Sequence, residues 1–116
     1  MNQEIIENNK AQMRKGTLEY CILLVISKGE VYASDILNEL KETDLLVVEG
    51  TLYPLLSRLK TAGLLDYKWV ESESGPPRKY YSLTKSGREV LDQMNQAWSQ
   101  FNKSINQLIK KYEKNI

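Results

Sequence analysis

The residue types that most often carry out catalysis are scarce in this chain. It contains no His and a single Cys, Cys21. Ser57 with Lys60 and Ser82 with Lys85 match the S-x-x-K spacing of a serine nucleophile and its lysine, but neither pair has a partner motif. Cys21 lies in an apolar stretch, where a thiol behaves as a small hydrophobe. The sequence therefore predicts a binding protein and not an enzyme, with no metal site and no cofactor.

Charged residues that could bind nucleic acid are unevenly distributed. Sixteen Lys and Arg oppose fifteen Asp and Glu, and a formal net charge of +1 argues against a uniformly basic, histone-like protein. Residues 51–88 nevertheless carry seven basic groups against three acidic ones, whereas residues 30–50 carry six acidic groups against one basic one. Basic groups release counterions from phosphate when a protein binds DNA. Residues 51–88 are therefore the segment that we expect to contact DNA.

The hydrophobic pattern predicts the elements that must position these residues. Apolar side chains recur at helical spacing in four segments, and a stretch rich in aromatic and β-branched residues is interrupted by turn chemistry. We expect Ser34-Asp35 to cap the second helix, Thr84 to cap the last, and Pro54 to lie in the first turn of the third. The predicted elements are helices over Ile5–Lys28, from Ser34-Asp35, over Glu49–Ala62 and over Lys85–Lys114, and a β-hairpin of Leu65–Glu71 and Arg78–Leu83.

Three helices followed by a hairpin predict a mainly α (α+β) fold, a winged helix-turn-helix with a long C-terminal dimerisation helix. The helix over Glu49–Ala62 would be the recognition helix, because its leucines form one stripe and its polar residues lie opposite. We expect at least two of Trp69, Tyr80 and Tyr81 to pack in the core. Short polar side chains and arginine suit base edges and phosphates, so the predicted DNA contacts are Thr51, Ser57 and Arg58 on the helix and Lys68, Arg78 and Lys79 on the wing.

The last helix carries an unbroken heptad seam. Its apolar residues are spaced alternately by three and four positions over three heptads, and a helix of about thirty residues is roughly 45 Å long, longer than a small domain is wide. A twofold homodimer is the simplest way to bury such a seam; the alternative is a helix folded over its own core. We therefore divide the chain into residues 1–84, the DNA-binding unit whose first helix contributes to the dimer, and residues 85–116, the dimerisation helix. The predicted interface is Leu91, Met94, Trp98, Phe101, Ile105, Leu108 and Tyr112.

Two motifs make the sequence resemble a known family. Gly50-Thr-Leu-Tyr-Pro54, followed by Gly75-Pro-Pro-Arg-Lys-Tyr-Tyr81, closely resembles the PadR-like transcriptional regulators, and the likeness covers essentially the whole chain. The resemblance implies a dimeric winged-helix repressor of bacteria or archaea that reads a pseudo-palindromic operator. The single short C-terminal helix looks like the compact, LmrR-type subgroup. The resemblance also adds Tyr53, within the recognition helix, to the predicted DNA contacts.

The resemblance further suggests a small-molecule site around Trp98. In the LmrR-type subgroup, a Trp in a similar Ala-Trp-Ser context sandwiches flat aromatic drugs across the dimer, and this chain reads Ala97-Trp98-Ser99. Asn95 stands where that subgroup has an aromatic ring and Asn102 where it has an acid, so a preference for cations is not expected. The alternative is that Trp98 only packs in the dimer seam. The residues implied to line an aromatic effector site are Tyr20, Leu24, Asn95, Trp98 and Asn102.

The sequence also indicates the cellular compartment of the protein and two alternative functions. One Cys excludes an intrachain disulfide, the start of the chain is too polar for a signal peptide, and the longest apolar stretch, Tyr20–Ile26, is too short to span a bilayer. We therefore expect a cytoplasmic protein without a membrane partner. The main alternative to a DNA-binding repressor is a winged-helix module that binds another protein through the acidic 30–50 segment. A third possibility is a drug-binding dimer in which DNA binding is secondary.

Overall fold

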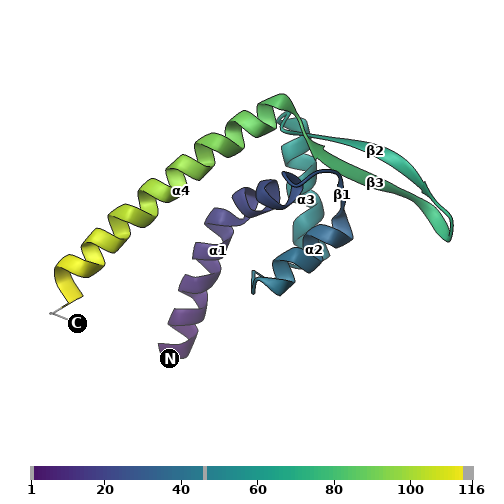
Figure 1. The fold of residues 1–116 in the computed structure, drawn as a ribbon. Coiled ribbons are helices and arrows are strands. Elements are labelled where there is room, and N and C mark those ends of the chain that lie inside the picture. The colour runs from purple at the N-terminus through teal and green to yellow at the C-terminus, as the bar shows by residue number, and fades with distance from the viewer. Residues whose placement is uncertain (1, 46, 114–116) are drawn as a thin grey trace.

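The computed structural model describes residues 2–45 and 47–113, and its elements form a winged helix (Figure 1). The predicted fold class is confirmed, although the short strand β1 was missed. The predicted end of the last helix, Lys114, lies outside the described residues. The elements are α1 (Asn2–Ile26), β1 (Val31–Tyr32), α2 (Ala33–Glu42), α3 (Glu49–Thr61), β2 (Leu65–Ser72), β3 (Gly75–Leu83) and α4 (Lys85–Tyr112).

The start of α4 follows from the predicted cap, and those of α2 and α3 correct the sequence predictions. Thr84 caps α4 as predicted, its hydroxyl oxygen accepting from the backbone N–H of Gly87 at 2.9 Å. Asp35 does not cap α2 as an N-cap residue: it is the third residue of the helix, and its carboxylate accepts from the backbone N–H of Tyr32 at 2.9 Å. Pro54 lies in the second turn of α3, because that helix already begins at Glu49. Because proline has no N–H, the carbonyl of Gly50 lacks its hydrogen bond within the helix. Gly50 is exposed, so water can bind that carbonyl instead.

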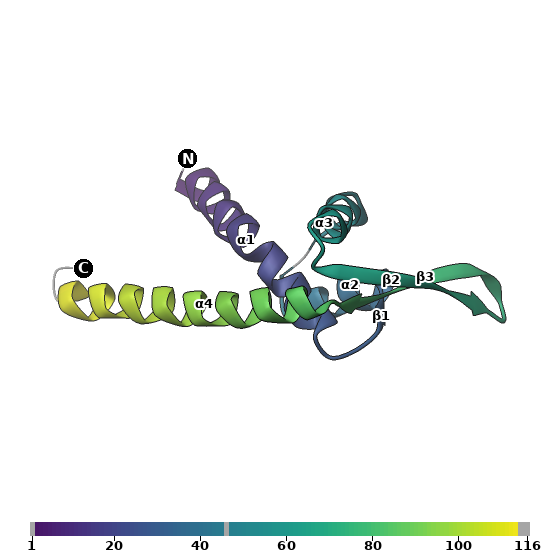
Figure 2. The same ribbon diagram turned by 90° about the horizontal axis from the view of Figure 1, so that it is seen from above.

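The three strands form an antiparallel sheet in the order β1-β3-β2. Val31 is aligned with Tyr81 on β3, and Trp69 on β2 is aligned with Lys79. Because β1 has only two residues, the outer half of the β2–β3 hairpin continues beyond it as a two-stranded wing. Figure 2 shows this wing and α4 projecting in opposite directions from the body of the molecule.

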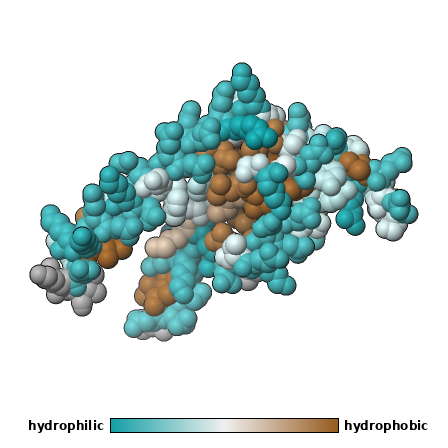
Figure 3. Space-filling view, in the orientation of Figure 1, coloured by the Kyte–Doolittle hydropathy of each residue, from teal (hydrophilic) through white to brown (hydrophobic). Residues whose placement is uncertain are grey.

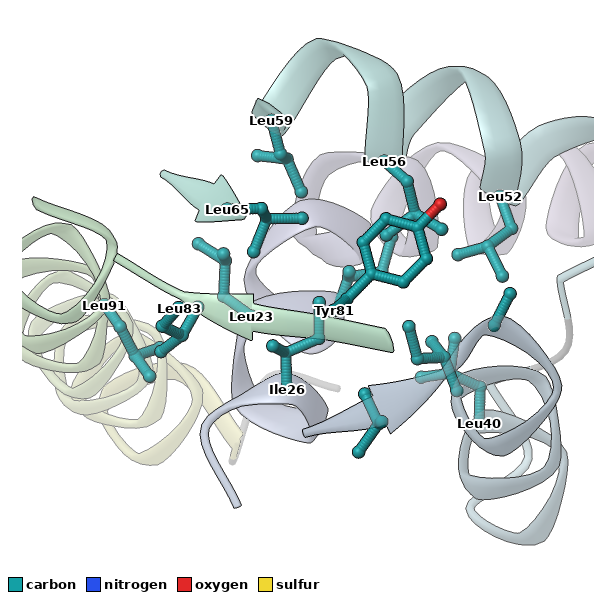
Figure 4. Close-up of a cluster of buried hydrophobic side chains, with 14 residues drawn as sticks. Leu23, Ile26, Leu40, Leu52, Leu56, Leu59, Leu65, Tyr81, Leu83 and Leu91 are labelled. Carbon is teal, nitrogen blue, oxygen red and sulfur yellow. The ribbon is translucent and has the colours of Figure 1, made fainter. Parts of the chain in front are cut away.

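The hydrophobic core lies where α1, α2 and α3 meet the inner half of the sheet (Figure 4). Leu52, Leu56 and Leu59 are buried as the leucine stripe predicts, while Leu55 is only partly buried. The expectation that two of Trp69, Tyr80 and Tyr81 lie in the core is wrong. Only Tyr81 is buried; Tyr80 is half-buried and Trp69 is 62% exposed, because Trp69 lies on the part of the hairpin that extends beyond β1.

Helix α4 leaves the core after its first turns. Leu91 packs against the core and Met94 is half-buried there. Farther along, Phe101, Ile105 and Leu108 are 64%, 51% and 58% exposed, and Figure 1 shows α1 and α4 diverging from the core. The alternative in which α4 folds over its own core is therefore wrong. Figure 3 shows hydrophobic surface at the junction of these two helices with the core and again near their free ends.

Among the described residues, no helix is both long and apolar enough to cross a bilayer.

Close packing at the start of α4 generates a prediction about stability. A Cβ atom at Gly87 would overlap the backbone carbonyl oxygen of Leu64, whereas a Cβ atom at Gly16 would meet nothing within 4 Å. We expect Gly87→Ala to lower the free energy of unfolding by about 1–3 kcal/mol, as overpacking does. Gly16→Ala, in the middle of α1, should raise it by about 0.5–1 kcal/mol. Urea denaturation of both variants checks the pair, and equal stability of Gly87→Ala and the unaltered protein would contradict it.

Candidate nucleic-acid interface

The exposed face of α3 presents polar side chains. The buried leucines fix the orientation of this helix, so the residues between them face solvent (Figure 4). Tyr53, which the family resemblance adds to the predicted contacts, is 49% exposed. Gly63, with a φ of +81°, ends the helix in a conformation that favours glycine and turns the chain into β2. The residues exposed on this face include all four predicted helix contacts, Thr51, Tyr53, Ser57 and Arg58.

The wing places its predicted cations on two different faces. Strand alternation and the register put Lys79 on the same face as its neighbour Trp69, while Lys68 and Arg78 lie on the opposite face. The Lys79 Nζ atom lies 4.4 Å from the ring centroid of Tyr67 and 5.3 Å from that of Trp69. The three residues predicted on the wing therefore do not form one patch.

A cleft of about 410 Å³ separates the wing from the helices. It brings Tyr53 of α3 together with Arg78 and Lys79 of β3, and the first residues of α2 close one side. The N-terminus of a helix carries a partial positive charge, so the cleft combines cations, hydroxyl donors and a helix N-terminus, the groups that contact a phosphate backbone. Its lining residues are Tyr32, Ala33, Ser34, Tyr53, Trp69, Pro77, Arg78, Lys79 and Tyr81.

Two of the tyrosines in and beside this cleft remain protonated at neutral pH. A hydrogen bond with Tyr32 raises the pKa of Tyr80, whose ring stacks on that of Tyr32 with centroids 4.0 Å apart. Burial raises the pKa of Tyr81. Because Tyr80 is hydrogen-bonded to Tyr32 and Tyr81 is buried, the tyrosine of this group that is exposed toward a phosphate is Tyr53.

Each predicted cation has a partner within the chain. Arg58 pairs with Glu19 of α1. Lys68 Nζ lies 3.0 Å from a carboxylate oxygen of Glu30, and the Arg78 guanidinium lies 5.3 Å from the ring centroid of Tyr32. Sequence reasoning missed these partners because they are distant along the chain. The contact between Trp69 and Lys79 could have been found, since strand alternation and the hairpin register align the two residues.

A second cluster joins α1 to α4. The Tyr20 hydroxyl donates to Oδ1 of Asn95, and the ring centroids of Tyr20 and Trp98 are 6.5 Å apart. Leu24 is 40% exposed and Trp98 is 46% exposed. Asn102 takes part in a different contact, accepting from Nδ2 of Asn106 at 3.2 Å. The structure thus brings together three of the five residues predicted for an effector site by contacts between their side chains.

The residues at catalytic spacing are not arranged as a catalytic site. Ser57 lies on the exposed face of α3, and the Lys60 ammonium of its S-x-x-K match lies 3.6 Å from a carboxylate oxygen of Asp66. Burial raises the pKa of the Cys21 thiol, which disfavours the reactive thiolate. Within the described ranges, no group of three His, Cys, Asp or Glu residues could hold a metal ion.

Comparisons with known proteins identify the family. Residues 22–93 match the model of the "Transcriptional regulator PadR-like family". A PadR-like transcription factor from Bacteroides fragilis is 56% identical, with 87% of this chain and 98% of that one covered and a TM-score of 0.74. A PadR family regulator from Eggerthella lenta is 30% identical over 93% and 95% of the two chains, with a TM-score of 0.81.

A third similar structure contains nucleic acid. It is Bacillus subtilis PadR in complex with operator DNA, 28% identical over 67% of this chain and 46% of that one, with a TM-score of 0.63. The family model and the two structures that align over most of both chains all belong to regulators of transcription, and none of them is an enzyme. The chain therefore belongs to the PadR-like family of transcriptional regulators.

Proposed function

We propose that this protein is a homodimeric repressor that binds a pseudo-palindromic operator through α3 and the wing. The observation that carries the proposal is the cleft that Tyr53 of the recognition helix and Lys79 of the wing line together, with Arg78 beside the Tyr32 ring at its edge. The operator complex of Bacillus subtilis PadR, a protein of the same family, supports a DNA ligand. As a regulator of transcription, the protein would act in the cytoplasm on chromosomal DNA.

The polar face of α3 is suited to the major groove. Thr51 and Ser57 can donate to or accept from base edges, and Arg58 can bind guanine or phosphate. Tyr53, together with Lys68, Arg78 and Lys79 of the wing, would contact the sugar-phosphate backbone and fix the position of α3. The two faces of the wing suggest that Lys79 contacts the strand nearest α3, while Lys68 and Arg78 reach phosphates on the wing's other side.

Self-association is supported by the apolar surface that α4 leaves uncovered. From Trp98 onward each seam residue is at least 46% exposed, and a seam at heptad spacing is suited to a second helix. On α1, Ile5, Ile6 and Met13 are also exposed, which supports a contribution of the N-terminal helix to the dimer. Leu91 and Met94 pack within their own chain, so they would form the edge of the interface. A twofold dimer would place two α3 helices about 34–36 Å apart, one turn of DNA.

An effector site at the dimer interface is the finer part of this proposal. The cluster of Tyr20, Asn95 and Trp98 offers aromatic faces and neutral polar groups. These groups suit a planar aromatic molecule without a positive charge, in the manner of the LmrR-type subgroup. Binding there would change the angle between subunits and hence the spacing of the two α3 helices, with a coupling free energy typically of about 1–3 kcal/mol.

Removing one cation from α3 and one from the wing tests DNA binding. Arg58→Ala combined with Lys79→Ala should weaken binding to the promoter fragment upstream of the protein's own gene by about tenfold or more and lower the slope of log K against log salt by up to about 1.8. Gel retardation at several salt concentrations measures both. The matched control is Lys103→Ala with Lys110→Ala, which removes the same charge from seam-opposite positions of α4. Unchanged affinity in the Arg58→Ala, Lys79→Ala variant would contradict the assignment, and a wild-type protein that binds no DNA would favour the protein-interaction alternative.

Introducing negative charges into the heptad seam of α4 tests whether this helix forms the dimer interface. Phe101→Asp together with Ile105→Asp should place like charges in the interface and convert the dimer to a monomer in sedimentation equilibrium. Loss of the dimer should also abolish binding to an operator with two half-sites, because a monomer contacts only one half-site. Lys103→Asp, on the outer side of the same helix, should remain dimeric. A dimer that survives the double substitution, or a wild-type protein that is monomeric, would show that α4 is not the interface.

Fluorescence tests the effector site. Trp69→Phe leaves Trp98 as the single tryptophan, and we expect planar aromatic compounds to quench its emission in a saturable manner. Neutral dyes should bind at least as tightly as cationic dyes of similar size, because the polar groups of the cluster, the Tyr20 hydroxyl and the Asn95 amide, are uncharged. Tyr20→Ala should weaken the quenching. If no member of a broad panel changes the emission, Trp98 serves only as packing.

A further inference from the structure

Glu19 of α1 holds the arginine of the recognition helix. Its carboxylate pairs with the Arg58 guanidinium, and the Oε1 atom that faces the guanidinium has almost no contact with solvent. The Glu19 side chain is 27% exposed, whereas that of Arg58 is 69% exposed. The acid is therefore fixed on the protein side of the pair, and the base lies on the side from which DNA would approach.

This pair makes the carboxylate a competitor of the phosphate backbone. Among the described residues, Glu19 Oε1 has no hydrogen-bond partner, so the contact with Arg58 is an ion pair. A phosphate attracts a guanidinium as a carboxylate does, so Glu19 and the DNA backbone compete for the same positive charge. The other basic residue of α3, Lys60, is directed toward Asp66 and the ring of Tyr67. Arg58 is thus the α3 cation with the most to contribute to DNA, and Glu19 offsets its charge in the free protein.

We propose that Glu19 is a specificity-determining residue: it holds Arg58 back from phosphates and so lowers affinity for DNA of arbitrary sequence. The inference rests on the proposed DNA-binding function. Binding to arbitrary sequences depends almost entirely on phosphate contacts, so it loses most when a cation is held back. Binding to the operator retains its base contacts and loses a smaller share of its affinity.

The test compares Glu19→Gln with the unaltered protein on two duplexes of equal length, the promoter fragment and a scrambled sequence. Glu19→Gln keeps the size of the side chain and removes its charge. We expect it to bind the scrambled duplex about two- to fivefold more tightly, the range that an exposed ion pair provides. The slope of log K against log salt should be steeper by about 0.9, corresponding to one additional phosphate contact.

Two controls separate the pair from a general effect of charge. In an Arg58→Ala background, Glu19→Gln should leave affinity unchanged, because the cation that it releases is absent. Glu42→Gln, which removes a charge from the exposed end of α2, should have a smaller effect than Glu19→Gln. Circular dichroism melting of each variant verifies that it is folded.

The outcomes distinguish this inference from the function on which it rests. A wild-type protein that binds neither duplex overturns the proposed DNA binding and the inference with it. A wild-type protein that binds, with Glu19→Gln equal to it or weaker, overturns the inference alone. The same holds if Glu19→Gln tightens binding equally without Arg58, or if Glu42→Gln tightens binding as much.

Discussion

The two-sided burial of the second half of α1 is the constraint on which the rest of the structure depends. Ile22, Leu23 and Ile26 are at most 1% exposed, and burial of each such side chain contributes about 1.5–3 kcal/mol. On one side α1 contacts α2, and on another it contacts α4 and β3. Helix α2, strand β3 and the long helix α4 are thus held in a fixed relation by one element, and the wing and α4 project in opposite directions from the body of the molecule (Figure 2).

The sequence predicted the features of the fold that leave a local or periodic pattern of residues. The leucines of α3, the alternation of the hairpin and the Thr84 cap each leave a local pattern, and all three are present in the structure. Strand β1 was missed because two residues are too few to show alternation. The error over Trp69 has the same origin: composition shows that a strand is aromatic, but whether a helix covers its outer half depends on tertiary packing.

The candidate site was predictable in its residues but not in its electrostatics. Arg58, Lys68 and Lys79 could be selected from residue type and element. Their partners Glu19, Glu30 and Tyr67 could not, because an ion pair or cation–π contact between distant segments leaves no periodic signal. Two of these partners, Glu19 and Glu30, are carboxylates from outside residues 51–88, and they offset part of that segment's excess of basic charge by direct contact with its cations.

The geometry of α1 relates the two candidate sites. Glu19 and Tyr20 are consecutive residues, and successive side chains of a helix point about 100° apart, so Glu19 contacts α3 while Tyr20 contacts α4. The core residues Ile22, Leu23 and Ile26 follow within two turns and fix the orientation of both side chains. Under the proposed function, one turn of α1 therefore contacts the recognition helix through Glu19 and the proposed effector cluster through Tyr20.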